Sequence, residues 1–411
     1  MTLTNKLFSY AATETGFNHI KINKKCEDAS DYYFDDENVL YICVVADGHG
    51  SDNYPRTDKG ARFAVDAAIR CICDFVGNAD ADQLIADEKN NYPLLTQLSK
   101  SILKEWYQYI EDDYTRNPIT LADLENVSDK YIRYYLSENP LECKYEKAYG
   151  CTLIAFAVTE KYSFGLQIGD GKCFLLDQNG TFIEPIPWDD NCQMNITTSI
   201  CDSDAIDEFR FCVLAKTPMA VFCGSDGIDD SYTSTEELCE FYRAILKIFI
   251  EHGEDVGKNE IREYLPVLTR KGSGDDVSLA MIIDLETITG YVRLLDIQSE
   301  IFKLCAALET KKKKIVILSD KMKATYKTLP DLFDRNAQEL KEFYDIVDQL
   351  KILQKEVEDD EKRLEDLSCE QQEFIYDREA ESFDEVLPDG DVDPEEGDLP
   401  IDTETDQKKE S

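Results

Sequence analysis

Residues 1–290 contain short β-rich runs separated by longer helical stretches, and this pattern restricts the possible folds more than any other feature of the chain. The runs come in local groups with helices inserted between the groups. That arrangement favours antiparallel sheets covered by helices over a regular βαβ succession. The predicted strands are Val39–Ala46, Thr152–Thr159, Tyr162–Ile168, Lys172–Asp177, Ala220–Cys223 and Val277–Asp284.

Turn and helix signals complete the prediction for this region. Tyr162–Ile168 and Lys172–Asp177 are joined by Gly-Asp-Gly, which predicts a β-hairpin with Asp170 in its turn. Five stretches have the spacing of amphipathic helices. These are Asp58–Phe75, Pro93–Tyr114, Leu121–Leu136, Thr235–Glu251 and Asn259–Arg270.

After Asp284 the pattern changes to that of long helices. Apolar residues recur at alternating steps of three and four in two runs, which keeps one stripe facing a partner helix. Thr328-Leu329-Pro330-Asp331 lies between the runs and should interrupt the helix. The first stripe is Leu294, Ile297, Ile301, Leu304, Leu308, Ile315, Leu318 and Met322, with Lys311 interrupting it; the second is Leu340, Phe343, Val347, Leu350, Val357 and Leu364, with Gln354 and Glu361 filling its seam.

Two arrangements of these helices remain open: a hairpin that folds back on itself, or a dimer. We expect residues 289–380 to form a coiled-coil-like hairpin. Self-association, or binding of a partner protein, would take place through residues 291–380. This segment should affect assembly or targeting more than chemistry, so truncation after about residue 290 should leave the preceding region folded. We therefore predict three regions: 1–288, 289–380 and a tail, 381–411.

The charge balance excludes two classes of partner. The chain has 85 acidic and 44 basic residues, a formal net charge of −41. Nucleic acids and anionic membranes both need clustered Lys and Arg, so we expect neither as a partner. Residues 381–411 hold 13 acidic and 2 basic residues with few apolar ones, which predicts a disordered acidic tail.

The fourteen cysteines are mostly isolated within apolar runs, and no C-x-x-C pair occurs. Such thiols are typical of small buried hydrophobic residues in a reducing compartment, not of a disulfide or zinc framework. The sequence has no basic-then-apolar signal at its start and no apolar run of membrane-spanning length. We therefore expect a cytoplasmic protein.

Four apolar runs carry an aspartate at one end, beside glycine: Asp47, Asp170, Asp226 and Asp275. Any single Asp-Gly is an ordinary turn signal, and Asp170 fits that interpretation best. Strand ends in packed sheets lie side by side, however, and crowded carboxylates repel unless a cation lies between them. An all-oxygen ligand set selects hard ions, Mg²⁺ or Mn²⁺. His49, one of three histidines, lies two residues after Asp47.

These residues resemble the metal-dependent protein phosphatases (PPM, the type 2C serine/threonine phosphatases), in a bacterial-type branch. Four motifs occur in the family's order over about residues 10–285, and an opening element, Cys26-Glu27-Asp28-Ala29, supports the same frame although it departs from the usual pattern upstream. Each of the four is a weak signal alone, and together they are strong. They are Ala46-Asp47-Gly48-His49-Gly50, Gly150-Cys151-Thr152 with Gly169-Asp170-Gly171, Gly224-Ser225-Asp226-Gly227-Ile228-Asp229-Asp230, and Gly274-Asp275-Asp276-Val277-Ser278.

The resemblance implies an α+β fold, an αββα sandwich of two antiparallel sheets with helices outside, and two Mg²⁺ or Mn²⁺ ions with a possible third. It assigns Asp47 as a bridge between two metals and the Gly48 carbonyl as a ligand of one. Asp226 and Asp275 would hold the other ion, and Glu27 would act directly or through water. Asp170 and Asp230 would form a weaker third site with Asp226, and Asp28 would support the ligands from behind.

The implied reaction is hydrolysis of phosphoserine and phosphothreonine in proteins by a metal-bridging water, without a phosphoenzyme. His49 would be the general acid that protonates the leaving alkoxide. The eukaryotic pattern places a phosphate-binding Arg where this chain has Asn23. We expect His19, eight residues before Glu27, to bind the phosphate instead, with Lys21, Lys24 or Lys25 as alternative sources of positive charge.

Two rival functions use the same residues. The loss of the Arg at Asn23 motivates a catalytically weak pseudophosphatase that binds phosphoproteins as an adaptor. The retained Asp47, Asp226 and Asp275 argue against it, since an adaptor has no need of a two-metal cluster. A Mg²⁺-dependent nuclease shares the carboxylate chemistry but is disfavoured by the net charge.

Overall fold

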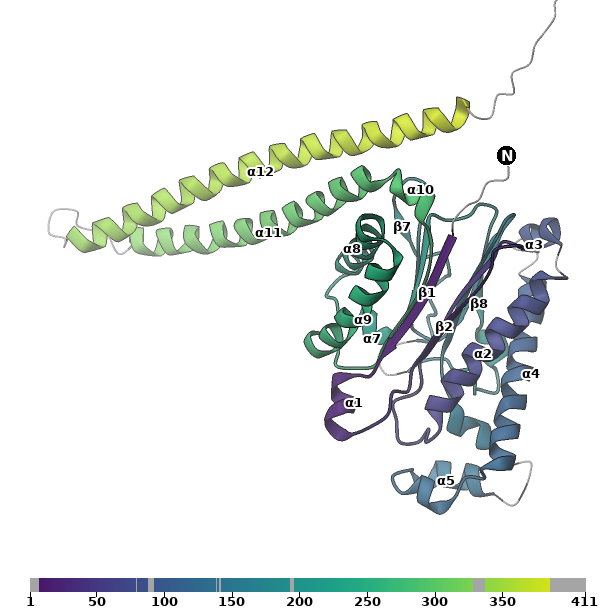
Figure 1. The fold of residues 1–411 in the computed structure, drawn as a ribbon. Helices are drawn as coiled ribbons and strands as arrows, with labels where there is room; N and C mark the ends of the chain where they lie inside the picture. The colour runs from purple at the N-terminus through teal and green to yellow at the C-terminus, as the bar shows by residue number, and fades with distance from the viewer. Residues whose placement is uncertain are drawn as a thin grey trace, which may run out of the picture.

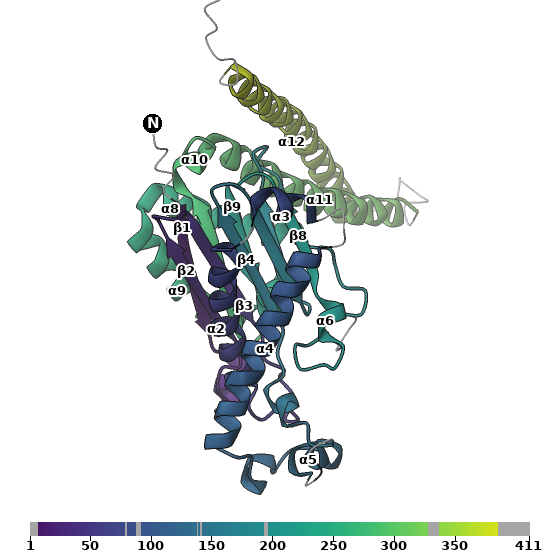
Figure 2. The same ribbon diagram turned by 90° about the vertical axis from the view of Figure 1, so that its right-hand side faces the viewer.

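A computed structural model describes residues 7–384 apart from 79, 88–91, 138, 140–141, 193–195 and 328–336. Two five-stranded antiparallel sheets pack face to face, and helices cover both outer faces (Figures 1 and 2). The predicted αββα sandwich is confirmed. Two long helices, α11 (Val292–Lys327) and α12 (Ala337–Asp384), form an arm beside the sandwich.

The first sheet has the strand order β1-β10-β9-β6-β7, and the second has the order β2-β3-β4-β5-β8. Their central strands are almost wholly buried, as apolar runs without polar alternation predict. The strands are β1 (Leu7–Glu14), β2 (Ala29–Asp35), β3 (Leu40–Ala46), β4 (Leu153–Thr159), β5 (Ser163–Ile168), β6 (Lys172–Leu176), β7 (Phe182–Ile183), β8 (Arg210–Leu214), β9 (Ala220–Gly224) and β10 (Val277–Asp284).

Three apolar clusters hold these layers together: one between the sheets, one under the helices of the β2–β8 sheet, and one under the helices of the β1–β7 sheet. The β2–β8 sheet is covered by α2 (Thr57–Val76) and α4 (Pro93–Arg116), and the other sheet by α8 (Thr235–His252) and α9 (Glu254–Lys271). The shorter helices are α1 (Phe17–Ile22), α3 (Ala81–Asp87), α5 (Asp129–Leu136), α6 (Ala205–Glu208), α7 (Asp226–Asp229), α10 (Leu285–Thr289) and the 3₁₀ turns η2 (Leu121–Leu124) and η3 (Tyr145–Tyr149).

The predicted hairpin around Gly169-Asp170-Gly171 is wrong. β5 pairs with β4 and β8 in one sheet, whereas β6 pairs with β9 and β7 in the other. The three-residue turn therefore crosses between the sheets, and Gly169 adopts a left-handed φ of 107° to make the crossing. Turn residues specify a local reversal of the chain but not which strands pair afterwards.

Two further expectations need correction. The predicted helix Leu121–Leu136 is divided into η2 and α5, because Ser128 between them donates from its backbone and its hydroxyl to Asn53 Oδ1. The sequence prediction also omitted β1, β2, β7 and β8. β2 and β8 lie at sheet edges, and their mixed composition lacks the continuous apolar pattern of the central strands.

The arm is an antiparallel helical hairpin, and ion pairs such as Arg293–Glu370 and Arg363–Glu300 join its two helices. Leu350 and Val357 of the predicted stripe are buried. Gln354 and Glu361 do not fill the seam: both are exposed, and the buried Leu353 and half-buried Asp360 lie there instead. Lys311, the interruption in the first stripe, lies 2.7 Å from Asp360 across the seam.

Two predicted boundaries of the arm can be compared with the structure only in part: the interruption between its helices and the start of the acidic tail. The predicted break at residues 328–331 lies outside the described residues. α12 continues to Asp384, so the first four residues assigned to the tail are helical, and the rest of the tail lies outside the described residues. No described helix combines the length and apolar character needed to cross a bilayer.

The base of the arm packs on the sandwich. Leu294, Leu295 and Ile297 of α11 are fully buried, and Leu295 belongs to the cluster under α8 and α9. Polar contacts reinforce this packing, since Gln298 donates to the Gly180 carbonyl and Lys247 pairs with Asp296. The domain boundary near residue 288 stays a prediction. Truncation there would remove these buried leucine and isoleucine side chains and expose the apolar surface that they cover.

Candidate active site

Strand ends from both sheets meet at one edge of the sandwich. β3 and β5 both run antiparallel to β4 and so end on the same side, where β9 also ends and β10 begins. A cleft of about 540 Å³ opens there. Its lining includes eight aspartates: Asp28, Asp47, Asp170, Asp202, Asp226, Asp230, Asp275 and Asp276.

The turn after β3 is held tightly in place. Asp47 accepts a backbone hydrogen bond from Thr152 N–H at 2.8 Å and donates its own N–H to Thr152 Oγ1 at 3.0 Å. A side chain at Gly48 would have its Cβ 2.4 Å from the Glu27 carbonyl oxygen, so only glycine fits there. The Asp47 carboxylate and the Gly48 backbone therefore have fixed positions at the cleft.

The electrostatics of the cleft are those of crowded acids. Burial raises the pKa of Asp47 well above its usual range, and the carboxylates of Asp28 and Asp226 raise it further. Burial likewise raises the pKa of Asp226 to about 6 and that of Asp28 to about 8. The pKa of Asp170 is shifted in the same direction, again mainly by burial.

These donors fit divalent cations. No Lys or Arg is among the described residues that line the cleft, and Asp28 Oδ2 is buried without a hydrogen-bond partner in the described structure. Hard oxygen donors at strand ends, beside backbone carbonyls, match the ligand preference of Mg²⁺ and Mn²⁺. The residues present are therefore suited to hold such ions.

The acid crowding predicts how metal-free protein responds to pH. An aspartate with a raised folded-state pKa contributes stability that is complete below its unfolded pKa and is lost as pH rises through the folded pKa. With EDTA present, we expect Tm to fall from about pH 4, near the ordinary pKa of aspartate, up to about pH 8, because the folded-state pKa is about 6 for Asp226 and about 8 for Asp28. Mn²⁺ should flatten this slope, and Asp226→Asn should make it shallower in EDTA. A Tm that rises with pH in metal-free protein would contradict this picture.

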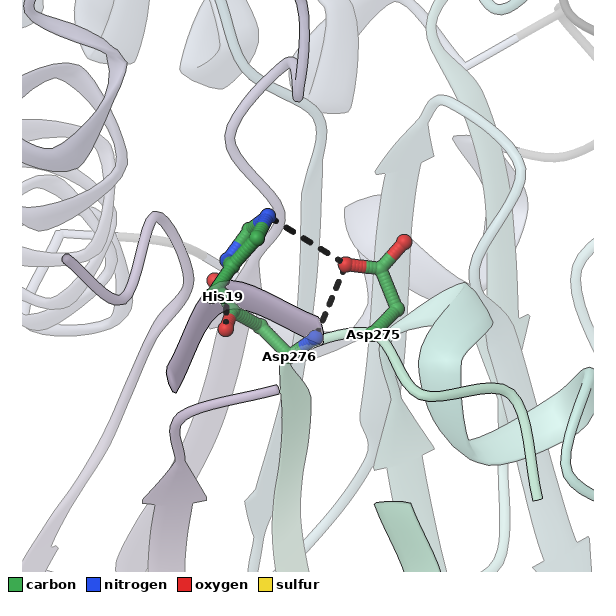
Figure 3. A group of neighbouring side chains, drawn as sticks. All are labelled: His19, Asp275 and Asp276. Carbon is green, nitrogen blue, oxygen red and sulfur yellow. Dashed lines mark hydrogen bonds and ion pairs between the residues drawn. The ribbon is translucent and has the colours of Figure 1, made fainter. Parts of the chain in front are cut away.

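Asp276 joins three segments of the chain at the edge of the cleft, and Figure 3 shows how it lies beside His19 and Asp275. Its Oδ1 accepts from Gly16 N–H at 2.6 Å and lies 2.9 Å from His19 Nδ1, and its Oδ2 accepts from Glu27 N–H at 2.6 Å. Burial opposes ionisation of this side chain, but the hydrogen bonds from His19, Glu27 and Gly16 outweigh it and lower its pKa. Asp276 thus fixes His19 and Glu27 relative to its neighbour Asp275.

His19 lies among three carboxylates. Besides the Asp276 contact, its Nε2 lies 3.9 Å from Glu27 Oε2 and 4.0 Å from Asp275 Oδ1. The hydrogen bond with Asp276 raises the pKa of the ring despite its burial. His19 therefore supplies positive or donor character beside the predicted metal ligands.

Glu27 is placed differently from the other predicted ligands. It is buried but does not line the 540 Å³ cleft, and instead lines an adjacent pocket with Lys24. Lys24 Nζ lies 2.7 Å from Glu27 Oε2 and donates to the Gly50 carbonyl at 2.7 Å. Lys25 pairs with Asp58 and Lys21 donates to Asn18, so Lys24 is the one of the three lysines that contacts a predicted ligand.

Asn23 has a structural role that explains its identity. It ends α1 in the left-handed conformation, at φ 56°, which Asn tolerates better than most residues. Its backbone N–H donates to the His19 and Ile20 carbonyls. The position that carries Arg in the eukaryotic pattern therefore caps a short helix here.

His49 forms part of the cleft wall. Its ring packs edge-on against Tyr54 with centroids 4.6 Å apart, and its backbone N–H donates to the Gly150 carbonyl at 3.3 Å. Burial lowers the pKa of the ring to about 4, so it is neutral near pH 7. A neutral imidazole keeps one N–H donor.

The structure brings His19, Asp28, Asp47, Gly48, His49, Asp170, Asp226, Asp230 and Asp275 into one cleft, with Glu27 beside it. The sequence names Asp276 only as part of a motif, and it gives no reason to prefer Lys24 over Lys21 or Lys25. Thr152, the support of Asp47, was not predicted from the sequence. The Asp-Asp pair before β10 was the available signal for Asp276, whereas Thr152 lies about a hundred residues from Asp47 and only the fold pairs them.

A two-sheet sandwich with an aspartate-lined cleft at the strand ends defines the architecture of metal-dependent protein phosphatases. The chain belongs to the protein phosphatase 2C family, whose model matches residues 15–266. No curated protein matches the sequence.

Several solved structures are similar in fold. PppA, described as a key regulatory component of T6SS in Pseudomonas aeruginosa, is 18% identical over 67% of this chain and 97% of its own, with a TM-score of 0.40. The catalytic domain of PstP, solved in complex with 2 manganese ions, is 15% identical over 67% and 97%, with a TM-score of 0.41. Stp1 from Staphylococcus aureus is 16% identical over 69% and 97%, also with a TM-score of 0.41.

Proposed function

We propose that this protein hydrolyses phosphoserine and phosphothreonine in proteins, with two Mg²⁺ or Mn²⁺ ions and room for a third. The observation that carries the proposal is the meeting of Asp47, Asp226 and Asp275 from three strand ends in one cleft without Lys or Arg among its described lining. Such a site is costly to the fold unless cations bind there.

The ligands are assigned by position. Asp47 and the Gly48 carbonyl would lie at the centre, Asp226 and Asp275 on one side, and Asp170 with Asp230 at a third, weaker position. Glu27 would act from the adjacent pocket, and Asp28 from the floor of the cleft. When bound, the ions would activate water for attack on phosphorus and offset the phosphate charge.

The chain's own residues would bind the phosphate and assist the leaving group. His19 Nε2 and the Lys24 ammonium flank Glu27 and can donate to phosphate oxygens. His49, on the wall of the cleft, is neutral near pH 7 and can donate its one N–H as a hydrogen bond to the leaving serine or threonine oxygen. Protonation of that oxygen by His49 requires the negative charge of the bound phosphate to raise the pKa of the ring. Asp276 acts as a positioning residue, because it holds His19 and the Glu27 backbone.

The decisive experiment is hydrolysis of a phosphothreonine peptide by the full chain. We expect turnover with Mn²⁺ or Mg²⁺ and none after EDTA, with recovery when the metal is restored, because the ligand set is all oxygen. Undiminished turnover by metal-stripped protein would sink the two-metal assignment. Tight binding of the phosphopeptide without turnover would favour the pseudophosphatase adaptor, which the absent Arg at Asn23 motivates.

The two cleft histidines should separate kinetically. His19→Ala should raise KM for phosphopeptide with little change in metal affinity, whereas His49→Ala should mainly lower kcat, by about a hundredfold. The His49 effect should be largest for phosphoserine and smallest for p-nitrophenyl phosphate, whose leaving group needs little protonation. An unchanged KM in His19→Ala, with a raised KM in Lys24→Ala, would assign phosphate binding to Lys24.

We infer two further features. A reducing compartment such as the cytoplasm suits this chain, because its cysteines are free thiols and most are buried. The second feature is self-association through the arm. It is supported by an apolar groove with carboxylates in its lining and by a lysine-rich stretch of α11 that has the complementary charge.

A further inference from the structure

An apolar groove lies on the outer face of the sandwich, where α11 crosses the α8–α9 pair. Its volume is about 430 Å³. The Phe241 ring at its base stacks with Tyr232 and Tyr264, at centroid distances of 5.5 and 5.6 Å. The rest of the apolar lining includes Ile248, Ile261 and Phe302, and three carboxylates, Glu237, Glu240 and Glu260, lie among the lining residues.

The distal half of α11 has the complementary chemistry. Residues 310–327 hold seven lysines and one acidic residue, in a chain with 85 acidic and 44 basic residues. Val316 and Ile317, between these lysines, are 60% and 68% exposed. Within the described part of the chain, no ion pair holds Lys314 or Lys321. This basic segment (residues 310–327) therefore presents apolar side chains among free positive charges.

The basic segment cannot reach the groove of its own molecule. α11 is one continuous helix, so the fifteen residues from Phe302 to Ile317 separate them by about 22 Å along its axis. The arm also extends past α8 away from the sandwich (Figure 1). Only another molecule can place a basic segment against this groove.

We propose that the groove receives the basic segment of a second copy, so that two chains exchange arms in a two-fold dimer. Apolar contact and opposite charge act together in such a pairing, and the contact forms twice in a symmetric dimer. The other long segments of this chain are unsuitable occupants, because α12 carries 17 acidic and 6 basic residues and residues 385–411 carry 11 and 2. Both would be repelled by the carboxylates of the groove.

The test is sedimentation velocity of the full chain, with light scattering for mass. We expect a dimer that weakens as salt rises. Ile317→Glu, which changes the exposed arm, and Glu260→Lys, which changes the groove, should each raise the dimer Kd at least tenfold. An equimolar mixture of the two variants should dimerise again, because the arm with the introduced glutamate then meets the groove with the introduced lysine, while the second contact stays native. Ile352→Glu on α12 is the matched control, because it makes the same substitution at a site with 60% exposure against 68% for Ile317, and it should have no effect.

Four results would overturn the proposal. These are a monomer up to about 100 µM, a dimer insensitive to Ile317→Glu, equal disruption by Ile352→Glu, or no recovery in the mixture. The last two would mean that the arms associate with each other and not with the groove. All of these readouts are independent of phosphatase activity, and circular dichroism of each variant separates loss of association from loss of fold.

Discussion

Asp226→Asn should abolish metal-dependent hydrolysis while leaving the fold intact or more stable in EDTA. The carboxylate is central to the cleft. Burial, followed by the negative charges of Asp170, Asp275 and Asp230, raises its pKa to about 6, although a hydrogen bond with Asp47 acts in the opposite direction. Metal charge stabilises a phosphoryl-transfer transition state by several kcal/mol, so we expect kcat/KM to fall by about a thousandfold. In EDTA the same change removes a repulsive charge, and Tm should rise by a few degrees.

The increase in the free energy of unfolding when metal binds is a second measurement of the same site. Native protein should gain stability from saturating Mn²⁺, by about 2.7 kcal/mol at a hundredfold excess over Kd, and Asp226→Asn should lose most of that gain. Asp47→Asn should behave in the same way. Glu37→Gln is the charge-matched control, since Glu37 is exposed in the β2–β3 turn at the opposite end of β3 from Asp47. Full metal-dependent activity in either Asp variant would show that the centre is misplaced.

Truncating the chain before the buried base of α11 should destabilise the fold strongly, whereas truncating it after that base should not. A chain ending at Gly290 loses Leu294, Leu295 and Ile297, each fully buried. Burial of one such side chain stabilises a fold by roughly 1.5–3 kcal/mol. Their combined loss approaches the total stability of about 5–15 kcal/mol typical of a domain. A chain ending at Lys303 keeps all three, so it should unfold cooperatively near the native Tm and retain hydrolysis.

Point variants in the full chain give the same contrast without a cut. Leu295→Ala should destabilise the catalytic domain by about 2–5 kcal/mol, whereas Leu304→Ala, on a half-buried site further along α11, should cost less. Urea denaturation followed by phosphatase activity would measure both. A chain ending at Gly290 with native Tm would instead support the boundary near residue 288 that the sequence pattern predicts.

The features that depend on local pattern and on motif order could be predicted from the amino-acid sequence. Asp47 and Asp226 follow apolar runs and Asp275 precedes one, which predicts an acidic cluster because antiparallel strands bring such ends to shared edges. The heptad spacing predicted two long helices, because it reports one continuous face per helix. Motif order identified the family and the sandwich.

Which distant groups come into contact depends on the three-dimensional fold and could not be predicted from local pattern. The Gly169–Gly171 turn crosses between sheets because pairing depends on β4, β8 and β9, not on the turn residues. Asp276 became the residue that joins His19 to Glu27 only when segments about 250 residues apart came together. In the same way, Leu353 and Asp360 fill the α12 seam because the partner helix and Lys311 select the buried face, which a run of three- and four-residue steps leaves ambiguous.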